Sequence, residues 1–283
     1  MSTMTSSKNS PTSLVKKALI YLAVALILIA TLTPLVWMVA TSIKPEPDIL
    51  VTPPRFLFTP TLDHYWFALA APEAPLVRGL YNSLIISLAT IALVVPISAL
   101  AAYGFARYNL GGGHLQFYIL TVKMFPPIAA IIPFFVIFQN LNLLDNVIAL
   151  IILNTLFNLP FAIWLLYGFF KEIPADLEES AMIEGSTRFE VFREIVLPLV
   201  APGLAVTAIF SILFTWNEFL FAFILTRSQA VTLTVAVSGF WTHRGILWGP
   251  LSAAATVCVI PMFIFALIIQ RYIVRGLTFG AIK

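Results

Sequence analysis

The stretch Glu178-Glu179-Ser180-Ala181-Met182-Ile183-Glu184-Gly185, followed nine residues later by Ile195-Val196-Leu197-Pro198, is a polar island in a very apolar chain. Seven of the thirteen acidic residues fall between Glu172 and Glu194. Only 10% of the 283 residues are charged and 60% are hydrophobic, whereas about a quarter of the residues of a soluble domain are charged. Most of the chain must therefore face lipid or other apolar helices, and the island must meet water or another protein.

The first part of the island predicts a short helix that ends in a sharp turn. Pro174 suits a helix start, and Asp176 to Ile183 can form about two helical turns. The acidic residues in this segment favour the positive N-terminal end of the helix dipole. We expect Gly185 to end the helix, because glycine adopts the left-handed conformation of a C-terminal cap without a clash at Cβ.

The second part of the island predicts an amphipathic helix. Thr187 to Glu190 has the spacing of a capping box, and Phe189, Phe192 and Val196 form an apolar stripe at helical spacing. We expect Leu197-Pro198 to end this helix before the next apolar stretch. A loop that only links two spans needs neither the glycine break nor the stripe, so we expect the island to dock a partner.

Six apolar stretches are long enough to cross a membrane, which takes about 20 residues. We expect spans at about residues 18–41, 81–106, 115–139, 147–170, 200–226 and 250–272. The expected organisation is a flexible tail at 1–17, a first transmembrane helix at 18–43, an extracytoplasmic loop at 44–79, a five-span core at 80–275 and a tail at 276–283. The island lies in the loop at 171–199, inside that core.

Lysine and arginine residues indicate the orientation of these spans, because cytoplasmic loops are enriched in them. The side of the N-terminus carries ten: Lys8, Lys16, Lys17, Arg107, Lys171, Arg188, Arg193, Arg271, Arg275 and Lys283. The other side carries five: Lys44, Arg55, Arg78, Arg227 and Arg244. We therefore predict that both termini and the polar island are cytoplasmic.

Several function classes are disfavoured by composition. A net charge of +3 without a long basic run gives no reason to expect nucleic acid as a partner. The single cysteine, Cys258, excludes a disulfide framework and a cysteine metal cluster, and the three histidines fall in expected loops, so we predict no metal site. The chain has no G-x-x-x-x-G-K-[ST] phosphate loop and cannot hydrolyse ATP by that route.

The expected spans carry many prolines, which survive in lipid where neighbouring helices or a water-lined cavity satisfy the freed backbone groups. This pattern favours a transport path, and polar side chains within the spans are its candidates. Lys123 could line the path, pair with Glu218 or extend toward an interface. Asn154 and Asn158 share one helix face and could bind a polyhydroxylated solute or another helix. Asn217 and Glu218 could contact solute, pack helices or act in gating.

The island resembles the coupling signature of the permease subunits of binding-protein-dependent ABC importers: E-A-A, three residues, G, nine residues, I-x-L-P. The matching positions are occupied by Glu179, Ala181, Gly185, Ile195, Leu197 and Pro198. Ser180 replaces the middle alanine, and Glu184 stands where sugar permeases usually have aspartate. These are mild departures from a specific pattern.

Two further stretches narrow the resemblance, which covers essentially the whole chain. Trp216-Asn217-Glu218-Phe219 resembles a pattern of sugar permeases, and the stretch from Arg275 to Lys283 resembles the tail of the smaller, second permease subunit of maltose-type importers. The resemblance implies an all-α integral membrane protein with the type I ABC importer permease fold. That fold has six transmembrane helices and a helix–turn–helix coupling loop, here residues 171–199.

The resemblance implies a multi-pass transport subunit of the cell (inner) membrane, and not an enzyme, that moves a sugar or polyol by alternating access. The chain itself would hold no cofactor, because two separate ATP-binding cassette subunits would bind ATP and Mg. The other implied partners are a second permease subunit, which would complete a heterodimer, an extracytoplasmic solute-binding protein and membrane lipid.

The resemblance also assigns roles to residues. Contact with the ATPase subunits is implied for Glu179, Ala181, Met182, Ile183, Gly185, Leu197 and Pro198. The tail would reach the ATPases through Thr278, Gly280 and Lys283.

Three alternatives stay open. A glycerol-phosphate-type solute would suit a cationic path at Lys123. A stand-alone secondary transporter would show inverted repeats, and the two halves of the chain do not match convincingly. An integral membrane enzyme would need a convergent acid–base or metal cluster, for which Lys123 and Glu218 alone are too few.

Overall fold

The computed structural model describes residues 11–70, 75–108, 110, 112–243 and 245–279. The elements are α1 (Pro11–Ser42), α2 (Glu46–Ile49), α3 (Asp63–Ala70), α4 (Leu76–Tyr108), α5 (Gly112–Val122), α6 (Pro127–Asn140), α7 (Val147–Glu172), α8 (Ala175–Ile183), α9 (Arg188–Glu190), the π-helical turn η1 (Val191–Val196), α10 (Leu197–Trp216), α11 (Leu220–Leu225), α12 (Leu233–Ser238), β1 (Trp241–Thr242), β2 (Gly245–Ile246) and α13 (Trp248–Phe279). The two strands form an antiparallel pair with Trp241 opposite Ile246.

Five helical segments in the described part of the chain are long and apolar enough to cross a membrane. They lie at Val15–Ser42, Leu76–Tyr108, Val147–Glu172, Arg188–Trp216 and Trp248–Ile268. The span expected at 115–139 is instead divided between α5 and the short apolar helix α6. The predominantly helical membrane fold is confirmed, apart from the short β1–β2 pair, and this one span differs because it is not a continuous helix.

Two of the expected spans are broken, each for an identifiable reason. Between α5 and α6, Pro126 and Pro127 have no backbone N–H, so the ladder of α5 cannot continue, and Pro127 starts α6 in a position that suits proline. Between α10 and α11, the carboxylate of Glu218 accepts hydrogen bonds from the backbone N–H groups of Phe221 and Ala222. It thereby caps the start of α11 as a separate helix.

Helix ends also differ from the boundaries expected from hydropathy. Residues 11–17 are helical and belong to α1, although their composition predicted a flexible tail, because a helix started in an apolar segment propagates through Lys16 and Lys17. Residues 1–10 lie outside the described residues. At the other end, α13 continues to Phe279, into the expected tail at 276–283.

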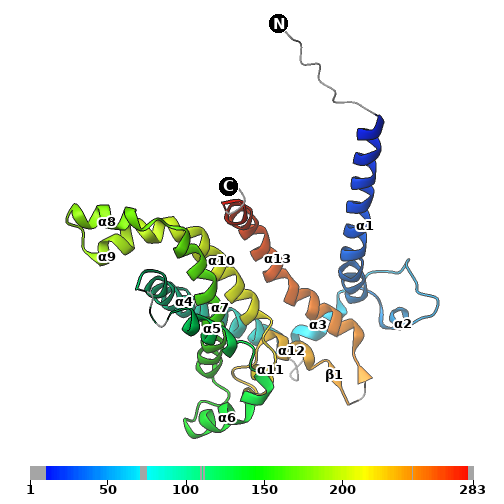
Figure 1. Cartoon of the computed structure of the whole chain (residues 1–283). Helices are drawn as coiled ribbons and strands as arrows, with labels where there is room; N and C mark the ends of the chain where they lie inside the picture. Colours follow the sequence, from blue (N-terminus) through cyan, green and yellow to red (C-terminus); the bar gives the residue numbers. More distant parts are fainter. Residues whose placement is uncertain (1–10, 71–74, 109, 111, 244, 280–283) are drawn as a thin grey trace.

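The helices α4 and α7 form the most extensive pair, and α10 packs against both. In Figure 1, α8 and α9 lie in the upper part of the view, as do the start of α1 and the end of α13. The elements α2, α6 and β1 lie in the lower part. Helix α1 stands apart from the bundle and packs mainly on α13. The coupling loop and the β1–β2 pair therefore mark opposite ends of the molecule.

Candidate coupling site and membrane cavity

The turn between α8 and α9 is a glycine-terminated helix end, as the sequence predicted. Gly185 has φ +101°, in the left-handed region. The N–H of Ser186 donates to the carbonyl of Ala181 (3.1 Å), and the N–H of Gly185 donates to the carbonyl of Met182 (3.1 Å). This pair of bonds is the Schellman arrangement that satisfies the last carbonyls of a helix. The direction in which the chain leaves α8 is therefore fixed by hydrogen bonds.

The helix that follows begins with the expected capping box, in which Thr187 and Glu190 satisfy each other's backbone N–H groups. The expected end at Leu197-Pro198 is wrong, because the helix continues through η1 into α10. In η1 the N–H of Leu197 donates to the carbonyl of Phe192, an i→i+5 bond, and such π turns and prolines are common causes of helix bending. Leu197 is half-buried and Pro198 is exposed at this joint.

The apolar stripe of this helix is only partly as expected. Phe192 and Val196 are buried, but Phe189 is 67% exposed, and Val191 takes its place in the core. Phe189 lies in α9, before the π turn, so the buried face starts two residues later than simple helical spacing predicts.

The coupling loop is anchored to α4 by a buried carboxylate, Glu178, which is 6% exposed. Arg107 donates from Nε to Oε1 of Glu178, and the hydroxyl of Tyr103 donates to Oε2 (2.7 Å). Arg107 also donates from Nη2 to the carbonyl of Ile173 (2.9 Å), at the C-terminal end of α7. We name Glu178, Arg107 and Tyr103 the Glu178 clasp.

Aromatic packing surrounds the clasp. The ring of Tyr103 lies 4.8 Å from that of Phe192 and 5.7 Å from that of Phe170, measured between centroids. The low dielectric of such surroundings strengthens a satisfied ion pair and penalises an unsatisfied one. Sequence reasoning missed this role of Glu178. The sequence did contain a signal for this ion pair, since Arg107 lies at the end of one expected span and the acidic loop follows another.

Most of the neighbouring signature residues face outward from α8. Ala181 is buried, whereas Glu179 and Gly185 are exposed, Met182 is 39% exposed and Ile183 is 87% exposed. Within the described residues, Glu179 forms no hydrogen bond or ion pair. Glu179 and Met182 lie on the rim of a cavity of about 210 Å³ that also contacts the clasp.

The predicted C-terminal contacts fall mostly outside the described residues. Thr278 lies in the last turn of α13. Gly280 and Lys283 lie beyond the described part of the chain.

All five polar residues that the sequence singled out within the spans line one cavity of about 400 Å³. The lining residues are Lys123, Pro127, Asn154, Phe157, Asn158, Phe214, Asn217, Glu218, Phe219, Leu220 and Phe221. They come from α7, α10 and α11 and from the two broken segments. Non-helical backbone is tolerated in a membrane where it is buried in protein or lines a cavity, so the helix breaks and the cavity belong together.

Lys123 reaches α7 and α10 and does not pair with Glu218. Its ammonium donates to the carbonyl of Phe157 (2.9 Å) and lies 4.7 Å from the centroid of the Phe214 ring. Among the described residues no carboxylate lies within ion-pair distance of it. Both oxygens of Glu218 are used on the N–H groups of α11. The possible Lys123–Glu218 pair is therefore absent, although both side chains line the same cavity.

The amide side chains of the cavity use their donors on protein groups. Asn154 donates to the carbonyl of Leu150 (2.9 Å), and Asn217 donates to the carbonyl of Leu213 (2.8 Å). Asn158 donates to the hydroxyl of Thr215 (3.1 Å) and so links α7 to α10, a contact of the helix-to-helix kind that was one of its two expected roles. Each amide also carries an oxygen that accepts hydrogen bonds, so the cavity presents acceptors together with one ammonium group.

A second carboxylate clasp, also missed from the sequence, lies at the opposite end of the molecule. Asp145, between α6 and α7, accepts hydrogen bonds of 2.9 to 3.1 Å from the backbone N–H groups of Arg227, Ser228, Gln229 and Ala230. Partial burial acts to raise the pKa of Asp145, but these N–H donors outweigh it and lower the pKa to about 2.

The same segment is held against the start of α4. Asn82 donates to the carbonyls of Gln229 and Val231 (both 2.8 Å), and Arg78 donates to the carbonyl of Ser228 (3.0 Å). The two ends of α4 are thus each tied to a different loop, one through Glu178 and one through residues 228–231.

Comparison with known families finds one match over most of this architecture. The family described as binding-protein-dependent transport system inner membrane component matches residues 94–279. That range includes the Glu178 clasp, the coupling signature and the cavity.

Three curated relatives match along most of their length. The probable ABC transporter permease protein y4oR of Sinorhizobium fredii is 40% identical over 89% of this chain and 90% of that protein. The sulfoquinovosyl glycerol transport system permease protein SmoH of Agrobacterium fabrum is 36% identical over the full length of both. The trehalose/maltose transport system permease protein MalG of Thermococcus litoralis is 35% identical over 95% of this chain and 97% of that protein.

A solved structure has the same fold. A chain of a bacterial ABC transporter involved in the import of the acidic polysaccharide alginate superposes with a TM-score of 0.76, covering 94% of this chain and 99% of that one. Because the sequence identity is 20%, this likeness is evidence for the fold alone.

Proposed function

The chain belongs to the binding-protein-dependent transport system inner membrane component family, and from that premise we propose that it imports a sugar or polyol through the cavity lined by Lys123, Asn154, Asn158, Asn217 and Glu218. It is a multi-pass membrane protein and the permease subunit of an ABC importer. Such subunits have no ATPase site of their own, and separate subunits bind and hydrolyse ATP. A solute-binding protein delivers the solute to importers of this family.

The first half of the proposal concerns how ATP hydrolysis by the partner subunits is coupled to this chain. Glu179, Met182, Ile183 and Gly185 form the surface that an ATPase subunit contacts, and the Glu178 clasp passes the movement of that surface to α4. The support is the contrast within α8, where Ile183 is 87% exposed although it is apolar and Glu178 is buried and fully bonded. The Glu178 clasp fixes α8 to α4, while Ile183 remains free to contact a partner. This arrangement suits a segment that a bound partner moves.

The second half concerns the path, and the observation that carries it is the gathering of all five polar side chains around one cavity. Ligand cavities commonly hold about 300–1,000 Å³, so about 400 Å³ accommodates a small solute. The amide oxygens accept hydrogen bonds from hydroxyl groups, while Lys123 supplies donors. The relatives named for sulfoquinovosyl glycerol and for trehalose/maltose favour a carbohydrate.

A second candidate solute is an anionic one, such as a glycerol-phosphate ester. The observation that favours it is the ammonium of Lys123, whose contacts within the described residues are one carbonyl and one aromatic ring.

The remaining parts of the proposal concern assembly. A second permease subunit pairs with this chain, two ATPase subunits dock on the cytoplasmic side, and ATP and Mg bind to them. Both termini and the coupling loop are cytoplasmic, which the excess of lysine and arginine on that side supports. Thr278, Gly280 and Lys283 extend the contact with the ATPases.

The test is uptake into proteoliposomes that contain the assembled importer, with its solute-binding protein outside and ATP inside. Thermal shift of the binding protein against sugars, polyols and glycerol phosphates first selects the solute. We expect loaded binding protein to stimulate ATP hydrolysis and uptake together. If loaded binding protein does not stimulate ATP hydrolysis in lipid, the proposed ATP-driven coupling is contradicted. If uptake is unchanged in the Asn154→Leu and Lys123→Met variants, the proposed solute path through the cavity is contradicted.

A further inference from the structure

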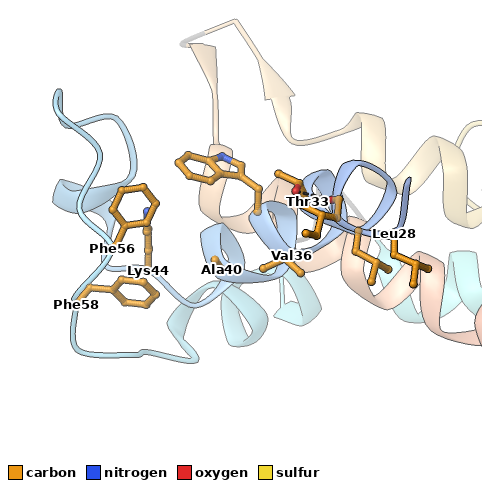
Figure 2. A pocket seen from close by; sticks show the side chains of 10 residues that line it. Leu28, Thr33, Val36, Ala40, Lys44, Phe56 and Phe58 are labelled. Carbon is orange, nitrogen blue, oxygen red and sulfur yellow. Dashed lines mark hydrogen bonds between the residues drawn. The ribbon is translucent and has the colours of Figure 1, made fainter. Parts of the chain in front are cut away.

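A groove beside α1 has the features of a binding site for one phospholipid, and it lies apart from both the coupling loop and the solute cavity. It has a volume of about 460 Å³ and is lined by Leu28, Ile29, Leu32, Thr33, Val36, Trp37, Ala40, Lys44, Phe56 and Phe58. Figure 2 shows these side chains along α1, with Lys44 at the end of the groove beside Phe56 and Phe58.

The body of the groove has the length of a lipid chain in one leaflet. From Leu28 to Ala40 it extends about 18 Å along the helix, at 1.5 Å per residue. One leaflet contributes about 15 Å of hydrocarbon to the membrane core. The residues along this length are apolar except Thr33, whose hydroxyl donates to the carbonyl of Ile29. The groove wall therefore offers an acyl chain nothing polar to desolvate.

Lys44 gives the groove a charged end. The residue is only 3% exposed, and its ammonium lies 4.9 Å from the centroid of Trp37 and 5.4 Å from that of Phe58. Aromatic faces attract a cation, but they carry no formal charge and leave the ammonium without a counter-ion. An enclosed charge without a counter-ion is costly, so a ligand that brings an anion is favoured.

The carboxylates nearby in sequence lie beside other side chains. Asp48 pairs with Arg55 (2.7 Å), and Glu46 lies 3.8 Å from His64. Within the described residues no acidic side chain comes within ion-pair distance of Lys44. The counter-charge has to come from outside the described chain.

The position of the groove fits the membrane interface. Lys44 lies two residues beyond Ser42, the last residue of α1, and the loop after it exposes Phe56 (75%) and Leu57 (95%). Trp37 packs edge-on against Phe56, with centroids 6.3 Å apart. Aromatic residues at the end of a span mark the level of the lipid head groups, where a phosphate lies.

We propose that this groove binds an anionic phospholipid, with its phosphate against Lys44 and an acyl chain along α1 from Ala40 to Leu28. The bound lipid supplies the charge that Lys44 lacks and fills the space between α1 and the loop that carries Phe56 and Phe58. It thereby holds α1, whose most apolar stretch has no residue buried within the chain, in a fixed place at the edge of the bundle.

The occupant is identified by photocrosslinking in the complete importer. p-Benzoylphenylalanine replaces Val36, and the purified complex is irradiated in detergent with an equimolar amount of dioleoylphosphatidylglycerol. The proposal predicts an adduct with the mass of that lipid. The same label at Leu26, which is exposed on α1 but does not line the groove, should give little adduct. An adduct between Val36 and the second permease, or no lipid adduct at all, would overturn the proposal.

The role of the charge is measured by native mass spectrometry during stepwise delipidation. Lys44→Met should retain about fivefold less phosphatidylglycerol than the unmodified importer, which corresponds to the roughly 1 kcal/mol that one basic residue contributes to anionic-lipid binding. Lys17→Met removes a charge at the other end of α1 and should retain as much phosphatidylglycerol as the unmodified importer.

If the Lys44→Met importer does not assemble, a variant that fills the groove provides the same test. Val36→Trp keeps the ammonium and should also lose the bound lipid. If Lys44→Met, Val36→Trp and the unmodified importer all retain the same amount of phosphatidylglycerol, the proposal is contradicted.

Discussion

The coupling loop and the membrane cavity use buried polar groups in opposite ways. At the coupling loop, Glu178 is paired with Arg107 and Tyr103, so every strong partner is inside the protein. In the cavity, Glu218 is used to start a helix, and Lys123 has no carboxylate within ion-pair distance among the described residues. The coupling loop is therefore held to α4 by bonds within the protein. The cavity lies beside two helix breaks, and its polar side chains bond to nearby carbonyl, hydroxyl and backbone N–H groups and not to an opposite charge.

The comparison extends to neighbouring residues of α8. Glu178 and Glu179 are the same residue type, yet one is 6% exposed and bonded and the other is exposed without a partner in the described chain. Helical spacing turns them about 100° apart, so one faces α4 and the other faces away. The residue that matches the family signature is therefore the outward one, and the residue that anchors the loop is its neighbour.

Breaking the clasp should have the largest effect. Arg107→Met leaves the carboxylate of Glu178 buried without its cation, and loss of one partner of a buried pair costs about 3–5 kcal/mol. We expect loss of ATP-driven uptake and lower thermal stability of the importer, measured by uptake and by a melting assay. Arg193→Met changes an exposed arginine of η1 and should leave both unchanged. Uptake at the normal rate in Arg107→Met would refute the role of the clasp.

The second prediction concerns the turn at Gly185. A valine there must adopt φ near +101°, which costs about 1–2 kcal/mol or more for a side-chain-bearing residue. The space around a Cβ at this position is open, so the effect is on the turn and not on core packing. Gly185→Val should assemble normally but lose most solute-driven uptake. Gly168→Val, at a helical glycine with equal space, is the control. Normal uptake in Gly185→Val would sink this prediction.

The third prediction concerns the cavity. Lys123→Met removes the ammonium that donates into it, and a hydrogen bond to a charged group is worth about 1.5–3 kcal/mol. We expect the KM for uptake to rise about tenfold, while basal ATP hydrolysis stays the same, because the coupling loop is intact. Lys17→Met is the matched control. A fall in basal ATPase activity with an unchanged KM would instead place Lys123 in coupling.

The smallest effect is expected at Asp145. Its pKa of about 2 lies below the ordinary value of 3.8 because four backbone N–H groups stabilise the charged form. The folded state binds a proton less readily than the unfolded state, so this contribution is complete above about pH 4 and is lost as the pH falls toward 2. Solvent screening reduces it to about 1 kcal/mol. Asp145→Asn should remove this part of the acid dependence of thermal stability. An identical acid profile in the variant would contradict the assignment.

Most of the fold and the local structure of the coupling loop could be predicted from the sequence, because both depend on local signals. Long apolar runs report membrane spans, Gly185 reports a helix end, and Thr187 with Glu190 reports a helix start. The breaks after Val122 and Trp216 were not predicted. Proline pairs are tolerated in membrane helices, so Pro126 and Pro127 indicate a break only where a cavity accepts one.

The two clasps could not be predicted, because each joins residues distant in the chain. Glu178 and Arg107 are 71 positions apart, and Asp145 is 82 or more from its partners. The polar residues of the cavity could be listed from the sequence, but their convergence depends on how α7 and α10 pack. The bonding of Glu218 depends on a helix start that hydropathy did not show.

The central claim is that the Glu178 clasp transmits the movement of the coupling loop to α4. The most direct measurement is the ratio of solute taken up to ATP hydrolysed in proteoliposomes of the double variant Arg107→Met/Glu178→Met. This variant removes both charges, so neither is left buried and unpaired, and assembly should be retained. We predict that ATP hydrolysis continues while the uptake ratio falls about tenfold or more, a change of at least about 1.4 kcal/mol in coupling. An unchanged ratio in a fully assembled importer would contradict the account.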